Sequence, residues 1–542
     1  ENMEQALCKC KMKSGSYMVM PVLNACTPRS LCGRAIEAAL DPSVYLATPI
    51  TALVKFGLMV NRTSYMQPLA QMLESTYADP YDIQKKLYGI ENYIKNANLD
   101  RQNLLETEAK LVEEDKLSAL AEEITAQTET QEDEVGEITG AAADIDELEI
   151  IQKPELTPDI LLEDFKPQSP IVDSMRTALF DNPEIDKSIW NELSIWNRSF
   201  AKRIKTSSVA IVPERDEYKF RYILQKDKNA PLIILYPSIG EGYNTHHSTV
   251  FAKMFFDEGY SIVMLGSHFH WEFVRSMPEG YCPGIPSQDA DNIKLVTHKI
   301  LDKLENKYEC KFDEKIIIGT SFGALSSLFV AEKESKNNTL GITKYIAISP
   351  PVELVYAVEQ LDKNSDELDN NSPEVKHKTA VTAAKILQIT KMKENNPDMN
   401  ISALPFTEQE GKLITTFLLR QKLSDLIFTI ENIAKGQKTD IYEAINNMSY
   451  RDYVEKYLLN GSSLENMRYE TSLYSLADYL VNNDNYRIYH SPDDFFATEG
   501  QIKRLKTLAG KHLVCVSNGS HLGFLYRKEF QEALKADVLG KI

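Results

Sequence analysis

Apolar runs alternate with helix-like segments from about residue 205 onward, and this alternation constrains the fold more than any other feature. The runs are short, continuous and rich in β-branched residues, as in strands buried on both faces of a sheet. We expect strands at residues 209–212, 218–224, 232–236, 261–265, 315–318, 345–348, 486–489 and 511–516. Helices are expected at residues 248–258, 289–305 and 524–534, and from 321 onward. This order predicts an α/β protein with a doubly wound, mostly parallel sheet.

The alternation stops between residues 351 and 480 and then resumes. That stretch is charged and helical in character, with apolar positions such as Phe417, Leu426 and Tyr457, and it has no strand pattern. The sequence therefore predicts a sheet that is interrupted by a helical insertion and completed after it.

One strand-to-helix junction carries a pattern with chemical meaning. Residues Gly319 to Gly323 read Gly-Thr-Ser-Phe-Gly, between an apolar strand and an apolar helix. Such a turn presents its serine above the edge of the sheet, and its flanking residues are small because strand and helix nearly collide. The start of the helix adds positive potential, and the backbone N–H of Phe322 would face a developing oxyanion. Ser321 is therefore the candidate nucleophile.

These residues resemble those of the α/β-hydrolase superfamily, and the resemblance covers roughly residues 205–350 and 481–540. It implies a serine, an acid and a histidine in that order along the chain. Asp493 follows a late strand and fits the acid best, with Asp494 as the alternate. Many members carry Gly-Gly-His-x-Gly-Phe at the histidine.

The matching segment here is Asn518 to Phe524, which reads Asn-Gly-Ser-His-Leu-Gly-Phe, with Ser520 in place of the second glycine. The histidine is His521. By the logic of such triads, Ser321 attacks the substrate, His521 takes and returns its proton, and Asp493 orients the imidazole.

A second oxyanion donor is expected from the loop after the third strand, where the family often has His-Gly-x-Gly. The loop here is Tyr236-Pro237-Ser238-Ile239-Gly240. Pro237 has no N–H to donate, so Ser238 or Ile239 would supply it. Tyr236 takes the place of the usual histidine.

Two histidine pairs lie near the carboxyl ends of the strands, where ligands bind in open α/β sheets. They are His246–His247 and His268–His270. Tyr236, His268 and His270 are candidates for lining a substrate pocket, and structural polar contacts are the alternative. The resemblance implies neither a metal site nor a cofactor.

We therefore expect a serine hydrolase that cleaves a carboxylic ester or related acyl compound through an acyl-enzyme intermediate. The substrate would be a small-molecule or lipid acyl compound, and the insertion would act as a cap that restricts access. Two alternatives remain, namely a serine peptidase of the same fold and a catalytically silent, hydrolase-like scaffold of the cell envelope.

Most of the excess negative charge of the chain lies in one segment. The net charge is −19, and residues 106–164 contain 20 acidic and three basic residues. Such a run is usually a solvated linker or an exposed helix. No basic patch is present in the sequence, so nucleic acid is not an expected partner.

The N-terminus carries its own signal. Three lysines precede the apolar residues 17–23 and a Leu-Asn-Ala-Cys sequence that ends at Cys26. This pattern resembles a bacterial lipoprotein signal, which implies lipidation of Cys26 and attachment to a membrane of the bacterial cell envelope. Without lipidation the expected location is cytoplasmic. No run of 18 uncharged apolar residues exists, so no spanning helix is predicted.

These observations together predict seven segments. They are a candidate signal (1–30), a small helical region (31–98), an acidic helix or linker (99–170), a connecting helical segment (171–204), the first part of the hydrolase core (205–350), the helical cap (351–480) and the second part of the core (481–542).

Overall fold

The computed structural model describes residues 156–182, 185, 200–366, 375, 378, 382, 385, 403–431, 444–445, 447–459 and 461–541. All of them belong to one compact unit of the chain. The helices expected before residue 99, the candidate lipidation residue Cys26 and most of the acidic segment lie outside the described residues.

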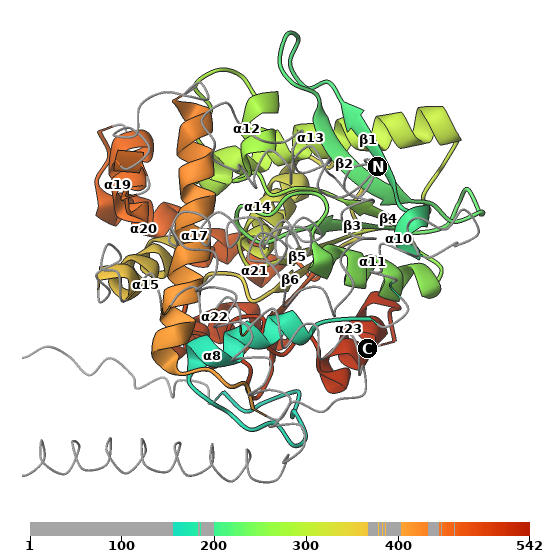
Figure 1. The fold of residues 1–542 in the computed structure, drawn as a ribbon. Helices are drawn as coiled ribbons and strands as arrows, with labels where there is room; N and C mark the ends of the chain where they lie inside the picture. The colour runs from blue at the N-terminus through green and yellow to red at the C-terminus, as the bar shows by residue number, and fades with distance from the viewer. Residues whose placement is uncertain are drawn as a thin grey trace, which may run out of the picture. The chain divides into compact units, whose positions relative to one another are not determined.

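An eight-stranded sheet forms the centre of this unit (Figure 1), with the strand order β1-β2-β4-β3-β5-β6-β7-β8. β2 runs antiparallel to both of its neighbours, and the strands from β4 to β8 run parallel to one another. This order, with these directions, is that of the α/β-hydrolase fold and confirms the predicted fold class. The strands are β1 (Lys205–Val209), β2 (Tyr218–Ile223), β3 (Leu232–Tyr236), β4 (Ser261–Met264), β5 (Lys315–Thr320), β6 (Lys344–Ile348), β7 (Tyr486–His490) and β8 (Leu513–Cys515).

Seven of the eight expected strands lie at or within a few residues of their predicted positions, but the first is displaced. It was expected at residues 209–212 and is formed by Lys205–Val209. β1 is an edge strand that pairs only with β2, and four of its five residues are polar and none of those four is buried. Only Val209, the last residue of β1, is apolar, so the apolar residues in the sequence begin where this edge strand ends.

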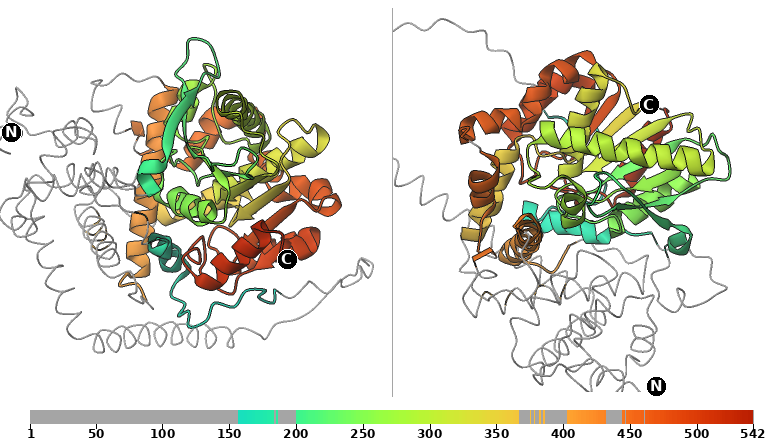
Figure 2. Two further views of the ribbon diagram at one scale, coloured as in Figure 1. Left: turned by 90° about the vertical axis from the view of Figure 1, so that its right-hand side faces the viewer. Right: turned by 90° about the horizontal axis from the view of Figure 1, so that it is seen from above.

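Helices cover both faces of the sheet (Figure 2). α13 (Pro286–Tyr308), α14 (Phe322–Lys336) and α22 (Glu499–Ala509) pack on one face, and α11 (His246–Asp257) and α23 (Lys528–Val538) pack on the other. Side chains of β3 alternate between the two cores, since Leu232 and Ile234 face one and Ile233 and Leu235 face the other. This double burial explains the continuous apolar runs in the sequence.

The described residues between β6 and β7 are mainly helical, which confirms the predicted helical insertion. Its described elements are α15 (Leu354–Asp366), α17 (Glu408–Ile430), α19 (Tyr450–Tyr453), the π-helical turn η2 (Val454–Leu458), α20 (Leu464–Glu470), the 3₁₀ turn η3 (Leu473–Leu476) and α21 (Ala477–Asn482). α17 is the long orange helix of Figure 1. It starts at a capping box in which Thr407 and Glu410 satisfy each other's backbone N–H groups.

Residues 159–180, called the strap below, lie against the hydrolase core. The sequence predicted an acidic helix or linker up to residue 170 and a connecting helical segment after it. The backbone of Ile160 instead extends the sheet beyond β8 by a bridge to Val516. The strap then forms α8 (Pro170–Ser174) and the 3₁₀ turn η1 (Met175–Leu179). Asp173 and Arg176 form a fully buried ion pair of 2.8 Å within it.

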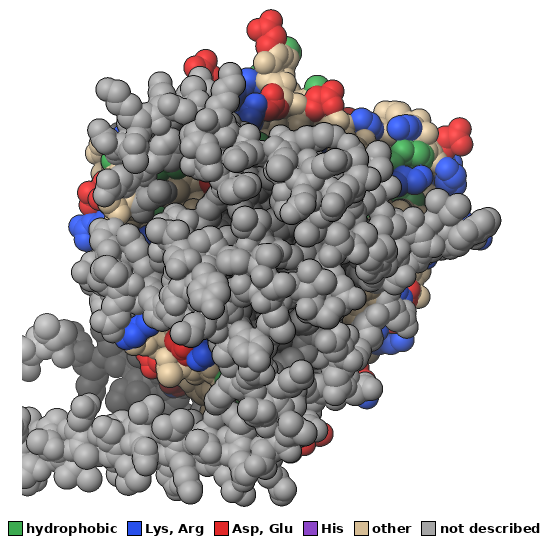
Figure 3. Space-filling model, in the orientation of Figure 1, with side chains coloured by type: hydrophobic (Ala, Val, Ile, Leu, Met, Phe, Trp, Pro, Cys, Tyr) green, Lys and Arg blue, Asp and Glu red, His purple; other side chains and the backbone are tan. Residues whose placement is uncertain are grey.

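Charged side chains of both signs are interspersed among the coloured residues of the face in Figure 3. Such a mixture is expected where the excess of acidic residues lies in another part of the chain, the segment 106–164. Within the described residues, none of the helices is both long and apolar enough to cross a membrane.

Candidate active site

Ser321 sits on the turn between β5 and α14, with a backbone φ of 51° and ψ of −121°. A non-glycine residue rarely adopts a positive φ, and such strain persists only where the surroundings enforce it. The surroundings here are hydrogen bonds. The N–H of Ser321 donates to the carbonyl of Ile348 at 2.8 Å, and the carbonyl of Ser321 accepts from Ala324 and Leu325 in the first turn of α14. The turn therefore holds the hydroxyl at the carboxyl end of the sheet.

Gly319 and Gly323 leave room for this turn because they have no Cβ. A Cβ on Gly319 would lie 2.5 Å from the carbonyl oxygen of Gly323. A Cβ on Gly323 would lie 2.5 Å from the carbonyl oxygen of Tyr236, at the end of β3. Real Cβ atoms do not approach backbone so closely, so both positions require glycine, as the sequence pattern indicated.

A continuous hydrogen-bonded chain runs from Ser321 through His521 to Asp494. His521 Nε2 lies 2.8 Å from Ser321 Oγ, and His521 Nδ1 lies 2.9 Å from Asp494 Oδ2. All three side chains are buried. An ionised carboxylate can only accept, so the proton of the neutral imidazole sits on Nδ1 and Nε2 is free to accept the hydroxyl proton of Ser321. The arrangement suits deprotonation of Ser321.

The environment of Asp494 keeps it ionised. Burial alone would raise its pKa, but the electrostatic interaction and hydrogen bond with His521, together with the nearby His490, lower the pKa below its usual range. The N–H of Phe496 also donates to Asp494 Oδ1 at 2.9 Å. Asp494 can therefore support a positive charge on His521.

Asp493 does not contact the imidazole, which corrects the expectation that it would orient His521. Its Oδ1 accepts the N–H of Ser520 at 2.9 Å, its Oδ2 accepts that of Gly519 at 3.3 Å, and Ser491 Oγ also donates to it. Burial raises the pKa of this carboxyl. Asp493 thus braces the turn that carries His521, and the alternate acid Asp494 makes the contact.

The turn around His521 is strained and is supported from the strap. Gly519, Ser520 and Leu522 all have a positive φ, so Ser520 adopts the conformation that glycine favours at this place in the family pattern. Ser174 Oγ accepts the N–H of His521 at 3.0 Å. Ser174 lies 347 residues away along the chain, and no sequence pattern marks it.

The loop after β3 lies beside Ser321, where the second oxyanion donor was expected. Tyr236 pairs with Gly319 across β3 and β5, so the ends of these strands are level. Ser238 Oγ lies 3.1 Å from Thr320 Oγ1, and Thr320 immediately precedes Ser321. Phe322 is the first residue of α14. The structure thus gathers Phe322, Ser238 and Ile239 near Ser321, and their roles as backbone donors remain predictions.

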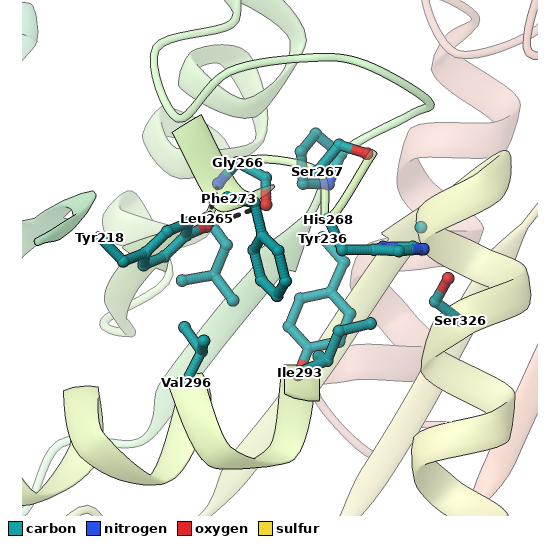
Figure 4. Close-up of a pocket in the computed structure, with 12 residues that line it drawn as sticks. Tyr218, Tyr236, Leu265, Gly266, Ser267, His268, Phe273, Ile293, Val296 and Ser326 are labelled. Carbon is teal, nitrogen blue, oxygen red and sulfur yellow. Dashed lines mark hydrogen bonds between the residues drawn. The ribbon is translucent and has the colours of Figure 1, made fainter. Parts of the chain in front are cut away.

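Tyr236 and His268 line a small cavity (Figure 4), and Gly323 is another of its lining residues. The space open to the centre of a water molecule is about 10 Å³, which suits roughly one water and no acyl chain. The hydroxyl of Tyr236 pairs with Thr297 at 2.9 Å, and the ring of His268 stacks on that of Phe322 with centroids 4.6 Å apart. His268 therefore packs against Phe322, the residue that follows Ser321.

The remaining histidines of the two pairs, His246, His247 and His270, contact backbone groups. His270 caps α12 (Trp271–Ser276), where its Nδ1 accepts the N–H of Glu272 at 3.3 Å. His246 and His247 each lie 3.0 Å from a carbonyl oxygen of the strap, those of Phe180 and Thr177. Among the described residues, no group of three or more His, Cys, Asp or Glu side chains could hold a metal ion.

The fold is that of the α/β-hydrolases, and a hydrogen-bonded Ser–His–Asp chain lies at the turn between β5 and α14. The strand order defines the fold, and the distances from His521 to Ser321 and Asp494 define the hydrogen-bonded chain. Residues 1–93 match a different family, described as MlaA lipoprotein. No curated protein sequence matches the chain significantly.

Solved structures with a similar outline include three hydrolases. An esterase from Pyrococcus furiosus has 12% sequence identity and a TM-score of 0.34, with 64% of this chain and 94% of the esterase covered. A serine hydrolase from Cycloclasticus zankles has 15% identity and a TM-score of 0.35, with 62% and 99% covered. The thioesterase domain from the curacin biosynthetic pathway has 12% identity and a TM-score of 0.30, with 62% and 99% covered.

Proposed function

We propose that this protein is a serine hydrolase that cleaves a carboxylic ester or related acyl compound. The observation that carries the proposal is the buried chain of hydrogen bonds from Ser321 through His521 to Asp494. Such a chain is what activates a serine hydroxyl, which is a weak nucleophile at its ordinary pKa. The strained backbone of Ser321 adds support, since strain of this kind clusters at active sites.

The reaction runs in two halves. Ser321 Oγ bonds to the acyl carbon of the substrate while its proton passes to His521 Nε2. The tetrahedral intermediate collapses, the bond to the leaving group breaks, and His521 returns the proton to that group. A water molecule then attacks the acyl-enzyme, with His521 again taking its proton and giving it to Ser321 Oγ. Asp494 stabilises the imidazolium formed in each half.

The negative oxygen of each tetrahedral intermediate needs backbone donors. Phe322 N–H at the start of α14 is one candidate, helped by the positive end of the helix. Ser238 or Ile239 N–H, from the loop beside it, is the other. These assignments follow the resemblance to the superfamily and the level ends of β3 and β5.

Labelling with a fluorophosphonate probe, followed by peptide mapping, tests the proposal. We expect a stoichiometric adduct on Ser321 that is absent from Ser321→Ala and strongly slowed in His521→Ala. Hydrolysis of p-nitrophenyl esters should follow the same pattern. A folded, monodisperse wild-type protein that forms no adduct would overturn the proposal and favour a binding or scaffold role.

We also propose that the chain is attached to a membrane through its N-terminal region. The match of residues 1–93 to a lipoprotein family supports attachment, and Cys26 is the lipidation residue that the sequence suggests. Labelling of cells with an alkyne-bearing palmitate tests this. Loss of label and of membrane association in Cys26→Ser supports the assignment, and a variant that still labels contradicts it.

A further inference from the structure

One peptide group next to the candidate oxyanion donors is held at both of its polar ends. Its carbonyl oxygen, that of Ile239, accepts a hydrogen bond of 2.8 Å from Lys422 Nζ. Its N–H, that of Gly240, donates to Ser267 Oγ at 3.3 Å. The two bonds fix the plane of this peptide. They thereby limit the directions in which the preceding N–H groups, those of Ser238 and Ile239, can point.

Lys422 comes from the helical insertion and not from the sheet. It lies on α17, 183 residues further along the chain than Ile239. Its stem also packs on Gly240, since a Cβ at that glycine would lie 2.7 Å from Lys422 Cβ. Gly240 has a φ of 64°, which glycine adopts without strain. The loop is therefore shaped around this one side chain.

Lys422 also brings a cation to the loop. Burial lowers the pKa of its ammonium group, and the charge of the neighbouring Glu241 opposes that shift. His270 is also near Lys422, and burial together with the charge of Lys422 lowers the pKa of His270 to about 3. A neutral His270 therefore adds no positive charge beside Lys422.

We propose that Lys422 is a positioning residue for the oxyanion site, so that the helical insertion completes the catalytic machinery as well as covering it. The inference rests on the proposed serine hydrolase function. In the superfamily pattern a histidine stands where this chain has Tyr236, and the hydroxyl of Tyr236 points away to Thr297. The loop is held from the insertion, and its geometry depends on the docking of α17.

Lys422→Met tests the inference because methionine keeps the apolar stem and removes the ammonium. We expect kcat per titrated serine to fall about 30-fold, less than the roughly 100- to 1000-fold lost when an oxyanion donor itself is removed. KM should change less than about twofold, because the loop acts on the transition state. Binding of an alkyl trifluoromethyl ketone, which forms an oxyanion on Ser321, should weaken by the same factor as kcat/KM.

Three further variants distinguish a role of Lys422 in positioning the loop from a role in packing alone. Lys422→Arg retains a donor and should recover part of the lost kcat. Ser267→Ala removes the other hydrogen bond on the same peptide and should lower kcat without changing KM. Lys412→Met removes another lysine of α17, one that pairs with Glu408 on the same helix, and should retain wild-type kinetics. The midpoint of thermal unfolding is recorded for each variant.

Wild-type kcat per titrated serine in both Lys422→Met and Ser267→Ala overturns the inference, as does an equal loss in Lys412→Met. If Lys422→Met does not fold, the kcat values of Lys422→Arg and Ser267→Ala test the inference instead. Wild-type kcat in both of these variants then overturns it. Failure of the proposed function looks different, because wild-type protein would then form no fluorophosphonate adduct on Ser321.

Discussion

The imidazole of His521 is hydrogen-bonded to Asp494 and not to Asp493, although the two aspartates are neighbours in the chain. Asp494 Oδ2 lies 2.9 Å from His521 Nδ1, whereas Asp493 accepts the backbone N–H groups of Gly519 and Ser520. The two aspartates therefore hold one histidine in two ways, one through the ring and the other through the backbone of its turn.

This division predicts different effects for the two asparagine variants. Asp494→Asn removes the anion that stabilises the imidazolium and favours the wrong tautomer, so we expect kcat to fall by about 10³- to 10⁴-fold. Asp493→Asn keeps an oxygen that accepts the N–H of Ser520, so the loss should be about tenfold or less. Steady-state hydrolysis per titrated serine checks both values. Equal losses would contradict the assignment of roles.

Ser174→Ala should slow hydrolysis although the residue lies outside the sheet. The variant removes the hydroxyl that accepts the N–H of His521 at 3.0 Å. A lost hydrogen bond of this kind costs about 1 kcal/mol, which corresponds to a fall in kcat of about three- to tenfold. Ser174→Thr keeps the hydroxyl and should restore most of the activity. An unchanged kcat in Ser174→Ala would show that the strap does not support the catalytic turn.

Gly323→Ala should disrupt the nucleophile turn. The new Cβ would collide with the carbonyl oxygens of Tyr236 and Pro237, and backbone cannot move away cheaply. We expect a loss of about 3 kcal/mol in the free energy of unfolding and no detectable labelling of Ser321. Gly500→Ala is the matched control, since its Cβ would meet only Thr498 Oγ1 at 3.9 Å. It should be neutral or more stable by up to about 0.5 kcal/mol in urea unfolding.

The lowered pKa of His270 should make the folded protein less stable as the pH falls. Burial and the charge of Lys422 lower the pKa of His270 from 6.5 to about 3 in the folded protein. Between these values the unfolded chain binds a proton that the folded protein does not, so stability decreases as pH falls through this window. His270→Asn keeps an acceptor for the cap of α12 and should show a shallower decrease. Urea unfolding from pH 7 to pH 4 measures the slopes.

His298→Asn is the control for that series. His298 lies on α13 with 48% of its side chain exposed and pairs with Asp302. Its replacement measures how much the removal of a half-exposed histidine changes the slope of stability against pH. A His270→Asn slope equal to that of the wild type would show that this histidine protonates as readily in the folded protein as in the unfolded chain.

The elements around Ser321 could be read from local sequence because local physics sets them. Buried parallel strands need continuous apolar runs, and residues 232–236 and 315–318 have them. A tight strand-to-helix turn needs small residues on either side of its serine, and Gly319 and Gly323 supply them. The polar edge strand β1 has no such marker, so its predicted position was displaced.

The amino-acid sequence by itself determined the sheet, its helical insertion, and the two segments that carry Ser321 and His521. Each is encoded by patterns a few residues long. Tertiary structure decided which of two adjacent aspartates reaches the imidazole, because the direction of a side chain in a turn depends on what packs around it. It also brought Ser174 and Lys422 to the site from the strap and the insertion. Contacts across hundreds of residues arise from the packing of whole segments, which leaves no local pattern in the sequence.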